Sequence, residues 1–237
     1  MEHLDRLAVE CSAFGQILES GDLDAAVPGC PGWSLAELAA HLGGIHRWAR
    51  AAVTEGRPGN SRTHAPLGRQ QLVAWFADGA AQLQQTLRDA GPDAPCWTMS
   101  PPSAARYWMR RQAHETAMHR WDAQASQGIA GPLDPVLAGD GVAEVVEMFF
   151  PRQVRLGRQQ PLPHSLRIEI ADGTAHVLAG DGLGPDAARQ PCEATVSGPA
   201  EALLLLLWKR ITIDDPRLTL TGARAAALQV LSANLTP

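Results

Sequence analysis

Hydrophobic residues in the first half of the chain recur every three or four positions, the period of an amphipathic helix. This spacing predicts four helices, over about 2–20, 34–53, 68–90 and 104–127. Stretches rich in Gly and Pro separate them, as in 21–33. The second helix opens with Ser34 and Glu37 in the spacing of a capping box, in which each side chain bonds a free backbone amide of the first turn. The pattern indicates a helical bundle.

The pattern changes after Pro151. A fifth helix is expected near 140–150, and alternating polar and apolar residues then predict short strands in "SLRIEIADG", "TAHVLAG", "CEATVSG" and "RLTLTG". The apolar run "PAEALLLLLWKR" predicts a buried helix, and "ARAAALQVLSANL" a closing one. The expected fold class is therefore α+β: a four-helix bundle domain over 1–150, then a smaller α+β domain over 160–237.

Composition narrows the class of protein. The chain has 237 residues, 45% hydrophobic and 19% charged, with a formal net charge of −5. This is a globular composition, and we expect neither a nucleic-acid partner nor a membrane one. The longest apolar run, 202–208, is far short of the roughly 20 residues of a membrane span. With no signal-peptide pattern at the N-terminus, a cytoplasmic protein is expected.

The four cysteines are scattered and include no C-x-x-C pair. Reduced thiols of a cytoplasmic protein are the expected state. Cys30 and Cys96 fall in predicted loops, where we expect them to be inert, and no cysteine is expected near a metal site.

The fourth helix contains a near miss to the zinc-protease motif H-E-x-x-H. Its sequence His114-Glu115-Thr-Ala-Met-His119 is one residue too long. At 3.6 residues per turn, His114 and His119 lie about 140° apart around the helix, so they cannot share an ion. Glu115 and His119 are four residues apart and share a face. The pattern therefore predicts an E-x-x-x-H pair in which Glu115 is a ligand and not a base.

A third ligand has to come from another helix of the bundle. His41 is the best candidate, because it lies among the apolar positions of the second helix. His46 lies about 140° around the same helix, so we do not expect both to bind. The alternative is that His41 is a core histidine held by a hydrogen bond. Spacing alone leaves the two interpretations nearly even.

Two charged residues lie near the predicted pair on the fourth helix. Arg111, one turn before Glu115, could hold a substrate carboxylate or could form a structural ion pair with Glu115. Asp122, three residues after His119, could accept the free ring N–H of a metal-bound histidine. Its alternative role is a solvated charge or a local cap.

Two segments carry a family resemblance. "VPGCPGWSLAELAAHLGGIHRWA" and "YWMRRQAHETAMHRWDAQ" resemble the mycothiol-dependent maleylpyruvate isomerase family of actinobacteria, a branch of the DinB-like helical bundles. The second half of the chain resembles the smaller domain of that family less specifically. The resemblance implies a divalent metal, usually zinc, held by His41, Glu115 and His119.

The resemblance also implies a function. Three protein ligands leave zinc an open position, where a thiol would bind as its thiolate. The implied thiol is mycothiol, whose addition to and elimination from the double bond of maleylpyruvate would isomerise it. The expected partners are thus a small-molecule substrate and a thiol cofactor, and no catalytic residue is expected beyond the metal site. Arg111 and Arg210 are the candidates for substrate carboxylate contacts.

Three alternatives remain. A mycothiol S-transferase would use the same metal and thiol but keep the electrophile. A non-enzymatic metal-containing protein would hold an apolar ligand or a partner. A hydrolase using metal-activated water is less favoured, because Glu115 is taken as a ligand and no other base accompanies the three.

Overall fold

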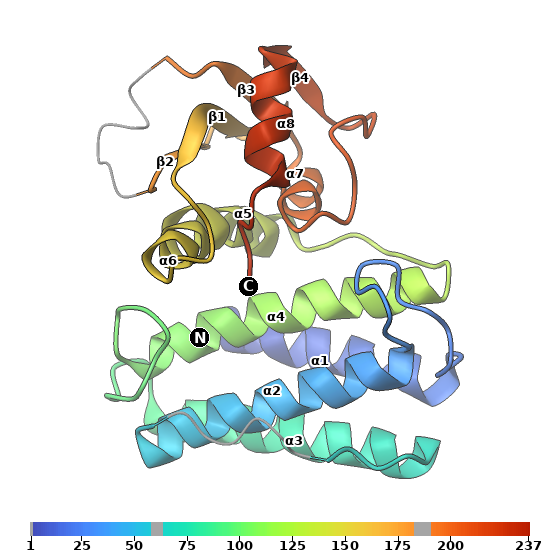
Figure 1. The fold of residues 1–237 in the computed structure, drawn as a ribbon. Coiled ribbons are helices and arrows are strands. Elements are labelled where there is room, and N and C mark those ends of the chain that lie inside the picture. The colour runs from blue at the N-terminus through green and yellow to red at the C-terminus, as the bar shows by residue number, and fades with distance from the viewer. Residues whose placement is uncertain (1, 58–63, 183–190) are drawn as a thin grey trace. The chain divides into compact units, whose positions relative to one another are not determined.

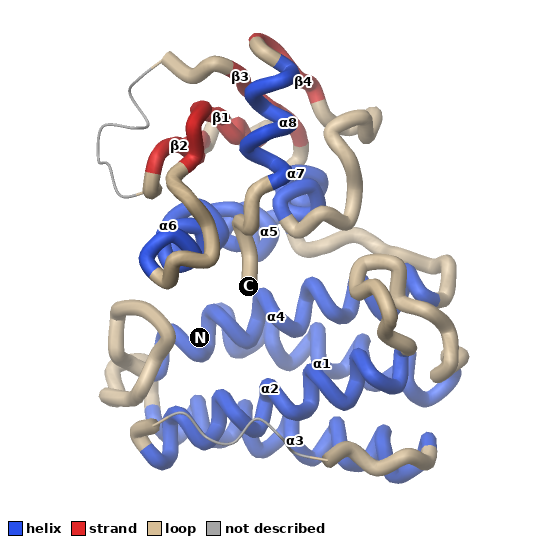
Figure 2. Tube along the Cα trace, in the orientation of Figure 1, coloured by secondary structure: helices blue, strands red, loops and turns tan. Residues whose placement is uncertain are grey.

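The computed structural model describes residues 2–57, 64–182 and 191–237. It divides the chain into two compact units, 1–132 and 133–237. The first is entirely helical, and the strands belong to the second (Figures 1 and 2). The α+β class and the N-terminal helical bundle expected from the sequence are confirmed.

Four helices form the first unit: α1 (Glu2–Ser20), α2 (Leu35–Glu55), α3 (Arg69–Ala90) and α4 (Ala105–Ser126). Their bounds follow the predicted ranges closely. Helix α1 packs against α3 and α4, and α2 packs against the same two helices, so each helix has two principal neighbours (Figure 1). The arrangement is a four-helix bundle.

The local sequence explains where α2 begins and ends. Ser34 and Glu37 form the predicted capping box, with each side chain bonded to the backbone amide of the other residue. The helix ends at Gly56, whose φ of 65° is a left-handed conformation that glycine adopts without a Cβ clash. One fully buried core joins α1, α2 and α3 through side chains such as Phe14, Leu38 and Phe76.

Helix α4 is the most deeply buried element of the bundle. Its buried side chains include polar and charged ones on several faces, among them Arg111, His114, His119 and Asp122. Buried polar groups require partners. The partners of these side chains therefore show where the candidate chemistry lies.

The second unit begins with α5 (Pro135–Glu144), a π-helical turn η1 (Val145–Phe149) and α6 (Phe150–Arg155). The sequence analysis predicted one shorter helix here, near 140–150, and assigned it to the bundle domain. In the structure, α5 packs against α7, and both helices belong to the second unit. The sequence analysis did not predict the π-helical turn η1. It lies just before Pro151, a residue that removes one backbone donor from the helix.

The sheet has the order β2-β1-β3-β4 and is mixed. Strand β1 (Leu162–Ile170) pairs antiparallel with β2 (Ala175–Gly180) and parallel with β3 (Ala194–Gly198), which pairs antiparallel with β4 (Thr219–Gly222). The parallel β1–β3 pair brings residue 166 opposite residue 194. The four strands are those that the alternating pattern predicts.

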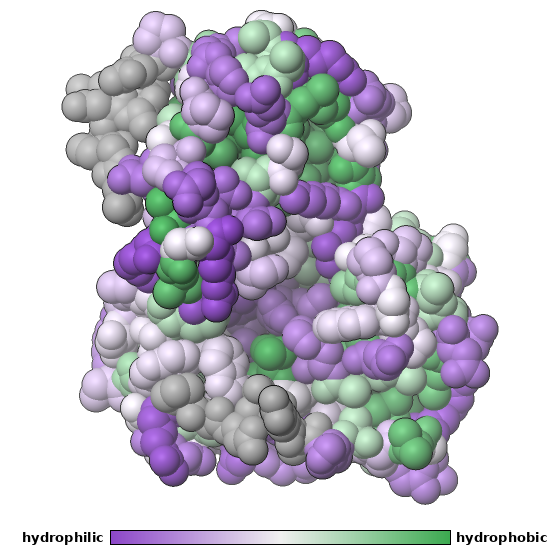
Figure 3. Space-filling view, in the orientation of Figure 1, coloured by the Kyte–Doolittle hydropathy of each residue, from purple (hydrophilic) through white to green (hydrophobic). Residues whose placement is uncertain are grey.

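Two helices complete the second unit. Helix α7 (Ala200–Leu207) is apolar except for Glu201 and is buried along most of its length, as its sequence predicts, and α8 (Arg224–Ser232) packs on β1 and β3. Hydrophilic side chains cover much of the visible face of each unit (Figure 3). Within the described ranges, no helix is both long and apolar enough to cross a bilayer.

Candidate metal centre

Helices α2 and α4 bring three candidate ligands together in the bundle. His41 extends from α2, and Glu115 and His119 extend from α4, one turn apart. The ligand atoms of the three residues all lie within 4.8 Å of one another. Nε2 of His41 and Nε2 of His119 each lie 3.4 Å from Oε1 of Glu115. This is the set that the E-x-x-x-H spacing and the apolar position of His41 predict.

These distances fit a tetrahedral zinc site. Zinc binds nitrogen and oxygen ligands at about 2.0–2.2 Å, so neighbouring ligand atoms lie about 3.3–3.6 Å apart. Both separations from Oε1 of Glu115 fall in this range. Two imidazoles and one carboxylate are also a donor set that zinc uses in catalytic sites. The three residues therefore fit a divalent metal ion such as zinc.

The second nitrogen of His119 has its own partner. Its Nδ1 lies 3.0 Å from Oδ2 of Asp122, whose side chain is fully buried. An ionised carboxylate only accepts hydrogen bonds, so the bond places a ring proton on Nδ1 and turns Nε2 towards Glu115. Metal-binding histidines are commonly oriented in this way. The contact between Asp122 and His119 is present, and the role of Asp122 at a bound metal stays a prediction.

Cys30 lies beside His119 and Asp122, and here the sequence-based expectation was wrong. Its Sγ is 3.6 Å from Oδ2 of Asp122, within range of an S–H···O hydrogen bond. Cys30, His119 and Asp122 form a second group of potential ligands that shares His119 with the first. The loop before α2 brings Cys30 here, and no spacing in the sequence relates a loop cysteine to a residue in a distant helix.

Arg111 contacts the carboxylate of Glu115 on the side away from the histidines. Its Nη2 donates to Oε2 of Glu115, and the arginine is only 3% exposed. Of the two roles considered for Arg111, the structure shows the ion pair. Glu115 thus has a different partner for each oxygen: Arg111 at Oε2 and the histidines at Oε1.

The charges of the site follow from these contacts. Burial favours the neutral form of Glu115, but the Arg111 guanidinium and hydrogen bonds from His119 and His41 hold its pKa well below the usual range. Burial likewise opposes the charged form of His119, but hydrogen bonds to Asp122, Cys30 and Glu115 raise its pKa well above the usual value. The contacts of the site thus favour the charged forms of both Glu115 and His119.

Aromatic rings line the His41 side of the cluster. The ring centroid of Trp33 lies 4.8 Å from that of His41, and His41 and His119 meet edge to face at 5.2 Å. The His41 side chain remains 33% exposed. The ligand cluster is thus reachable from solvent on the side of α2, and His41 is less deeply buried than its apolar neighbours suggested.

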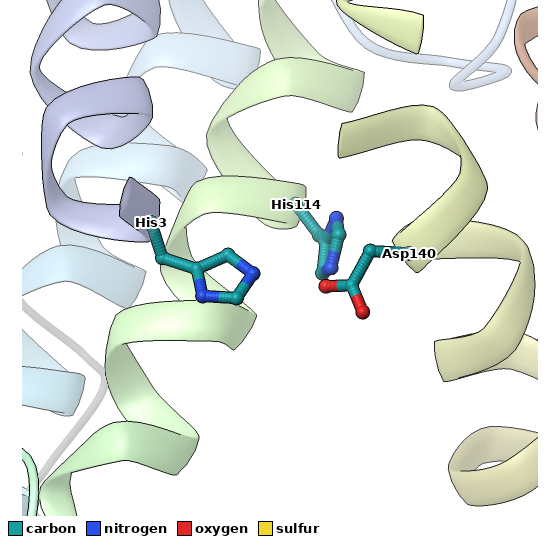
Figure 4. Close-up of side chains that lie close together, drawn as sticks. All are labelled: His3, His114 and Asp140. Atoms are coloured by element: carbon teal, nitrogen blue, oxygen red, sulfur yellow. The ribbon is translucent and has the colours of Figure 1, made fainter. Parts of the chain in front are cut away.

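The two histidines excluded by helical spacing do lie elsewhere. His46 is fully buried and bonds Thr116 through Nε2 at 3.0 Å. His114 lies edge-on to His3 of α1, with ring centroids 6.0 Å apart (Figure 4). Neither is a member of the His41, Glu115 and His119 group.

Arg210 lies in the second unit, after the end of α7. Its Nη1 donates to the backbone oxygen of Trp208 at 2.8 Å, and its guanidinium lies over the Trp208 ring at 5.8 Å. These contacts are local to the second unit. A role for Arg210 in substrate binding stays a prediction.

Fold and site together define a helical-bundle protein with a candidate His, Glu and His metal centre. Two family models match the chain: the mycothiol maleylpyruvate isomerase N-terminal domain over residues 4–124, and the C-terminal domain of the same family over residues 137–229. The chain belongs to the mycothiol maleylpyruvate isomerase family. The resemblance seen in the two sequence segments is thereby confirmed.

Solved structures show the same fold. A crystal structure of the mycothiol-dependent maleylpyruvate isomerase is similar, with a TM-score of 0.66, 16% identity and coverage of 94% of this chain and 93% of that one. A structure of a histidine-to-alanine mutant of that isomerase has a TM-score of 0.58 and 15% identity, covering 86% and 87%. A comparison with curated protein sequences finds no match.

Proposed function

We propose that this protein is a metal-dependent enzyme that uses mycothiol to isomerise maleylpyruvate. The observation that carries the proposal is the convergence of His41, Glu115 and His119 in a chain of this family. The names of the similar structures support the thiol and the substrate class, and the donor geometry supports the metal. Zinc is the ion that this donor set fits best.

The residues of the chain have distinct tasks in this proposal. His41, Glu115 and His119 would hold the ion, and three protein ligands would leave zinc one open position. Asp122 keeps the His119 ring turned so that Nε2 faces the ion. When bound, zinc supplies a thiolate at neutral pH, the nucleophile that reversible addition to a conjugated double bond requires. No residue outside this set is assigned to proton transfer.

The net charge of −5 supports small-molecule partners over nucleic acid. We place the protein in the cytoplasm, because its four cysteines are scattered along the sequence with no C-x-x-C pair, a usage typical of a reducing compartment. We propose Arg210 as a contact for a substrate carboxylate, because a guanidinium binds that group through two parallel hydrogen bonds.

The proposal is tested by thiol-dependent turnover. Zinc-loaded protein is mixed with maleylpyruvate, with and without mycothiol, and isomerisation is followed by ultraviolet absorbance. We expect turnover only with mycothiol, its loss in His41→Ala, and its retention in the matched control His164→Ala on β1 of the second unit.

The alternatives give different results in the same preparation. An S-transferase would conjugate mycothiol to an electrophile such as monobromobimane in a zinc-dependent way without isomerising maleylpyruvate. A binding protein would show neither activity while retaining its zinc. Either result would replace the isomerase proposal.

A further inference from the structure

We propose that Arg111 is a positioning residue that keeps Glu115 bound to the metal through one oxygen only. The inference rests on the proposed function, since it requires an ion at His41, Glu115 and His119. It differs from the expectation that Arg111 contacts substrate. In this role Arg111 acts on the reaction through Glu115 and touches neither the thiol nor the substrate.

The two carboxylate oxygens of Glu115 have different partners. Oε2 accepts from Nη2 of Arg111, while Oε1 lies 3.4 Å from Nε2 of each histidine. The two oxygens of the carboxylate therefore have separate tasks. Because Arg111 and Glu115 are one turn apart on α4, the helix itself fixes their relative positions.

The side chains of Arg111 and Glu115 are both largely shielded from solvent. The Arg111 side chain is 3% exposed and that of Glu115 is 14% exposed. If Arg111 turned to a substrate carboxylate, Glu115 would lose a charge-assisted hydrogen bond and would be left in a largely buried site without this cation. Exchanging Glu115 for a substrate carboxylate would therefore be costly. This geometry favours a permanent contact over a substrate clamp.

The consequence for the metal concerns its open position. A carboxylate can bind an ion through one oxygen or both, and zinc also accepts five ligands. With Oε2 engaged by Arg111, Glu115 offers one oxygen, and the position needed by a thiol stays open. Without Arg111, Oε2 becomes free to occupy that position.

Charge leads to the same conclusion. Within the part of the chain that the structure describes, the carboxylates of Glu115 and Asp122 lie in contact with the candidate ligands His41 and His119, and Arg111 offsets one of them. A divalent ion there would retain a formal excess of one positive charge, which one thiolate would neutralise. Removing Arg111 would cancel that excess before the thiol binds. The arginine thus favours the binding of an anionic thiol.

The test measures metal binding and coordination in Arg111→Met and Arg111→Lys. Zinc affinity is measured by competition with a chromophoric chelator, and coordination by the visible spectrum of the cobalt-substituted protein. In Arg111→Met we expect the visible cobalt spectrum to lose intensity, because Oε2 of Glu115 becomes a further ligand. Zinc should bind at least as tightly as in the parent, because the site gains a ligand oxygen and loses a positive charge. Arg111→Lys should keep part of the parent's spectrum, because it retains one charged donor.

Two comparisons separate this role from a general effect on folding. Arg106→Met removes a half-exposed arginine from the same helix and should leave zinc affinity unchanged. In a Glu115→Gln background, Arg111→Met should change the cobalt spectrum no further, because the arginine acts through that carboxylate.

An unchanged cobalt spectrum in Arg111→Met would overturn the inference alone. An equal change of the spectrum in the Glu115→Gln background would also overturn it, since the arginine would then act on the bundle in general. If the parent protein binds no zinc at all, the proposed function fails, and this inference fails with it.

Discussion

Nδ1 of His119 lies 3.0 Å from Oδ2 of Asp122, a carboxylate fully buried in the bundle. The bond fixes which ring nitrogen faces Glu115. A side chain three residues away on the same helix thus controls the orientation of a candidate ligand. Both residues belong to α4, where a spacing of three positions puts them on neighbouring parts of one face.

Replacement of Asp122 should weaken metal binding without removing a ligand. We expect Asp122→Ala to bind zinc about 10–100-fold less tightly, because the His119 ring loses the acceptor that holds its tautomer and orientation. Chelator competition measures the change. Asp89→Ala, at an exposed position near the end of α3, is the matched control and should bind zinc as the parent does. Equal affinities for Asp122→Ala and the parent would show that the contact has no such role.

His46 should make the stability of the bundle depend on pH. Burial is the main cause that lowers its pKa to about 3, against about 6.5 in an unfolded chain. Above pH 6.5 the histidine is neutral in both states. As the pH falls from about 6.5 towards 3, only the unfolded chain gains the proton, so the free energy of unfolding decreases by roughly 1 kcal/mol per pH unit.

Urea unfolding at pH 6.5 and pH 5, with a chelator present, measures this effect. The parent should lose roughly 2 kcal/mol more than His46→Gln between the two pH values, since the variant cannot take up that proton. Parallel pH dependences in parent and variant would argue against a neutral buried His46.

Cys11 should be the least reactive thiol of the protein. Its side chain is buried in α1, and burial raises the pKa of the thiol to about 12, so almost no thiolate exists at neutral pH. The half-buried Cys192 serves as the internal reference. Alkylation with iodoacetamide at pH 8, followed by peptide mass spectrometry, should modify Cys192 long before Cys11. Comparable rates at the two cysteines would mean that Cys11 is accessible in the folded state.

Arg120 and Glu10 form a buried ion pair between α4 and α1 that should be important for folding. Nε of Arg120 lies 2.7 Å from Oε2 of Glu10, and Nη2 donates to the backbone oxygen of Pro132 at 3.0 Å. Arg120→Met leaves the carboxylate of Glu10 buried without its cation. We expect a loss of about 3–5 kcal/mol in the free energy of unfolding.

The double variant Glu10→Leu with Arg120→Met identifies the source of that loss. The double variant also removes the Glu10 carboxylate, which Arg120→Met leaves buried without its cation. In denaturant unfolding, the double variant should therefore be more stable than Arg120→Met alone. If the double variant is the less stable of the two, the unpaired carboxylate is not what destabilises the single variant.

Local rules of sequence predicted most of the fold. Helical periodicity and the Ser34 capping box placed α2, and alternation placed the four strands, because each signal is carried by neighbouring residues. The wide turn at 145–149 and the grouping of α5 with the second unit depend on packing between distant segments. Periodicity does not contain that information.

The candidate site likewise has one part that local spacing predicts and another that depends on packing between distant segments. Glu115 and His119 share a face of one helix, so spacing alone predicts that they act together. His41 needed the assumption that its helix faces α4, which the structure bears out. Cys30 was missed because its position beside His119 depends on how a loop folds over the bundle. His41 itself is more exposed than an apolar helix face suggests.

The most direct test of the central claim is the zinc content of the protein, purified without a His-tag and measured by plasma mass spectrometry. Parent, His119→Ala and the control His164→Ala are compared after dialysis against excess zinc and removal of loosely bound metal. We predict about one zinc per chain in the parent and the control, and little in His119→Ala. No zinc in the parent, or an equal amount in His119→Ala, would contradict a metal centre at His41, Glu115 and His119.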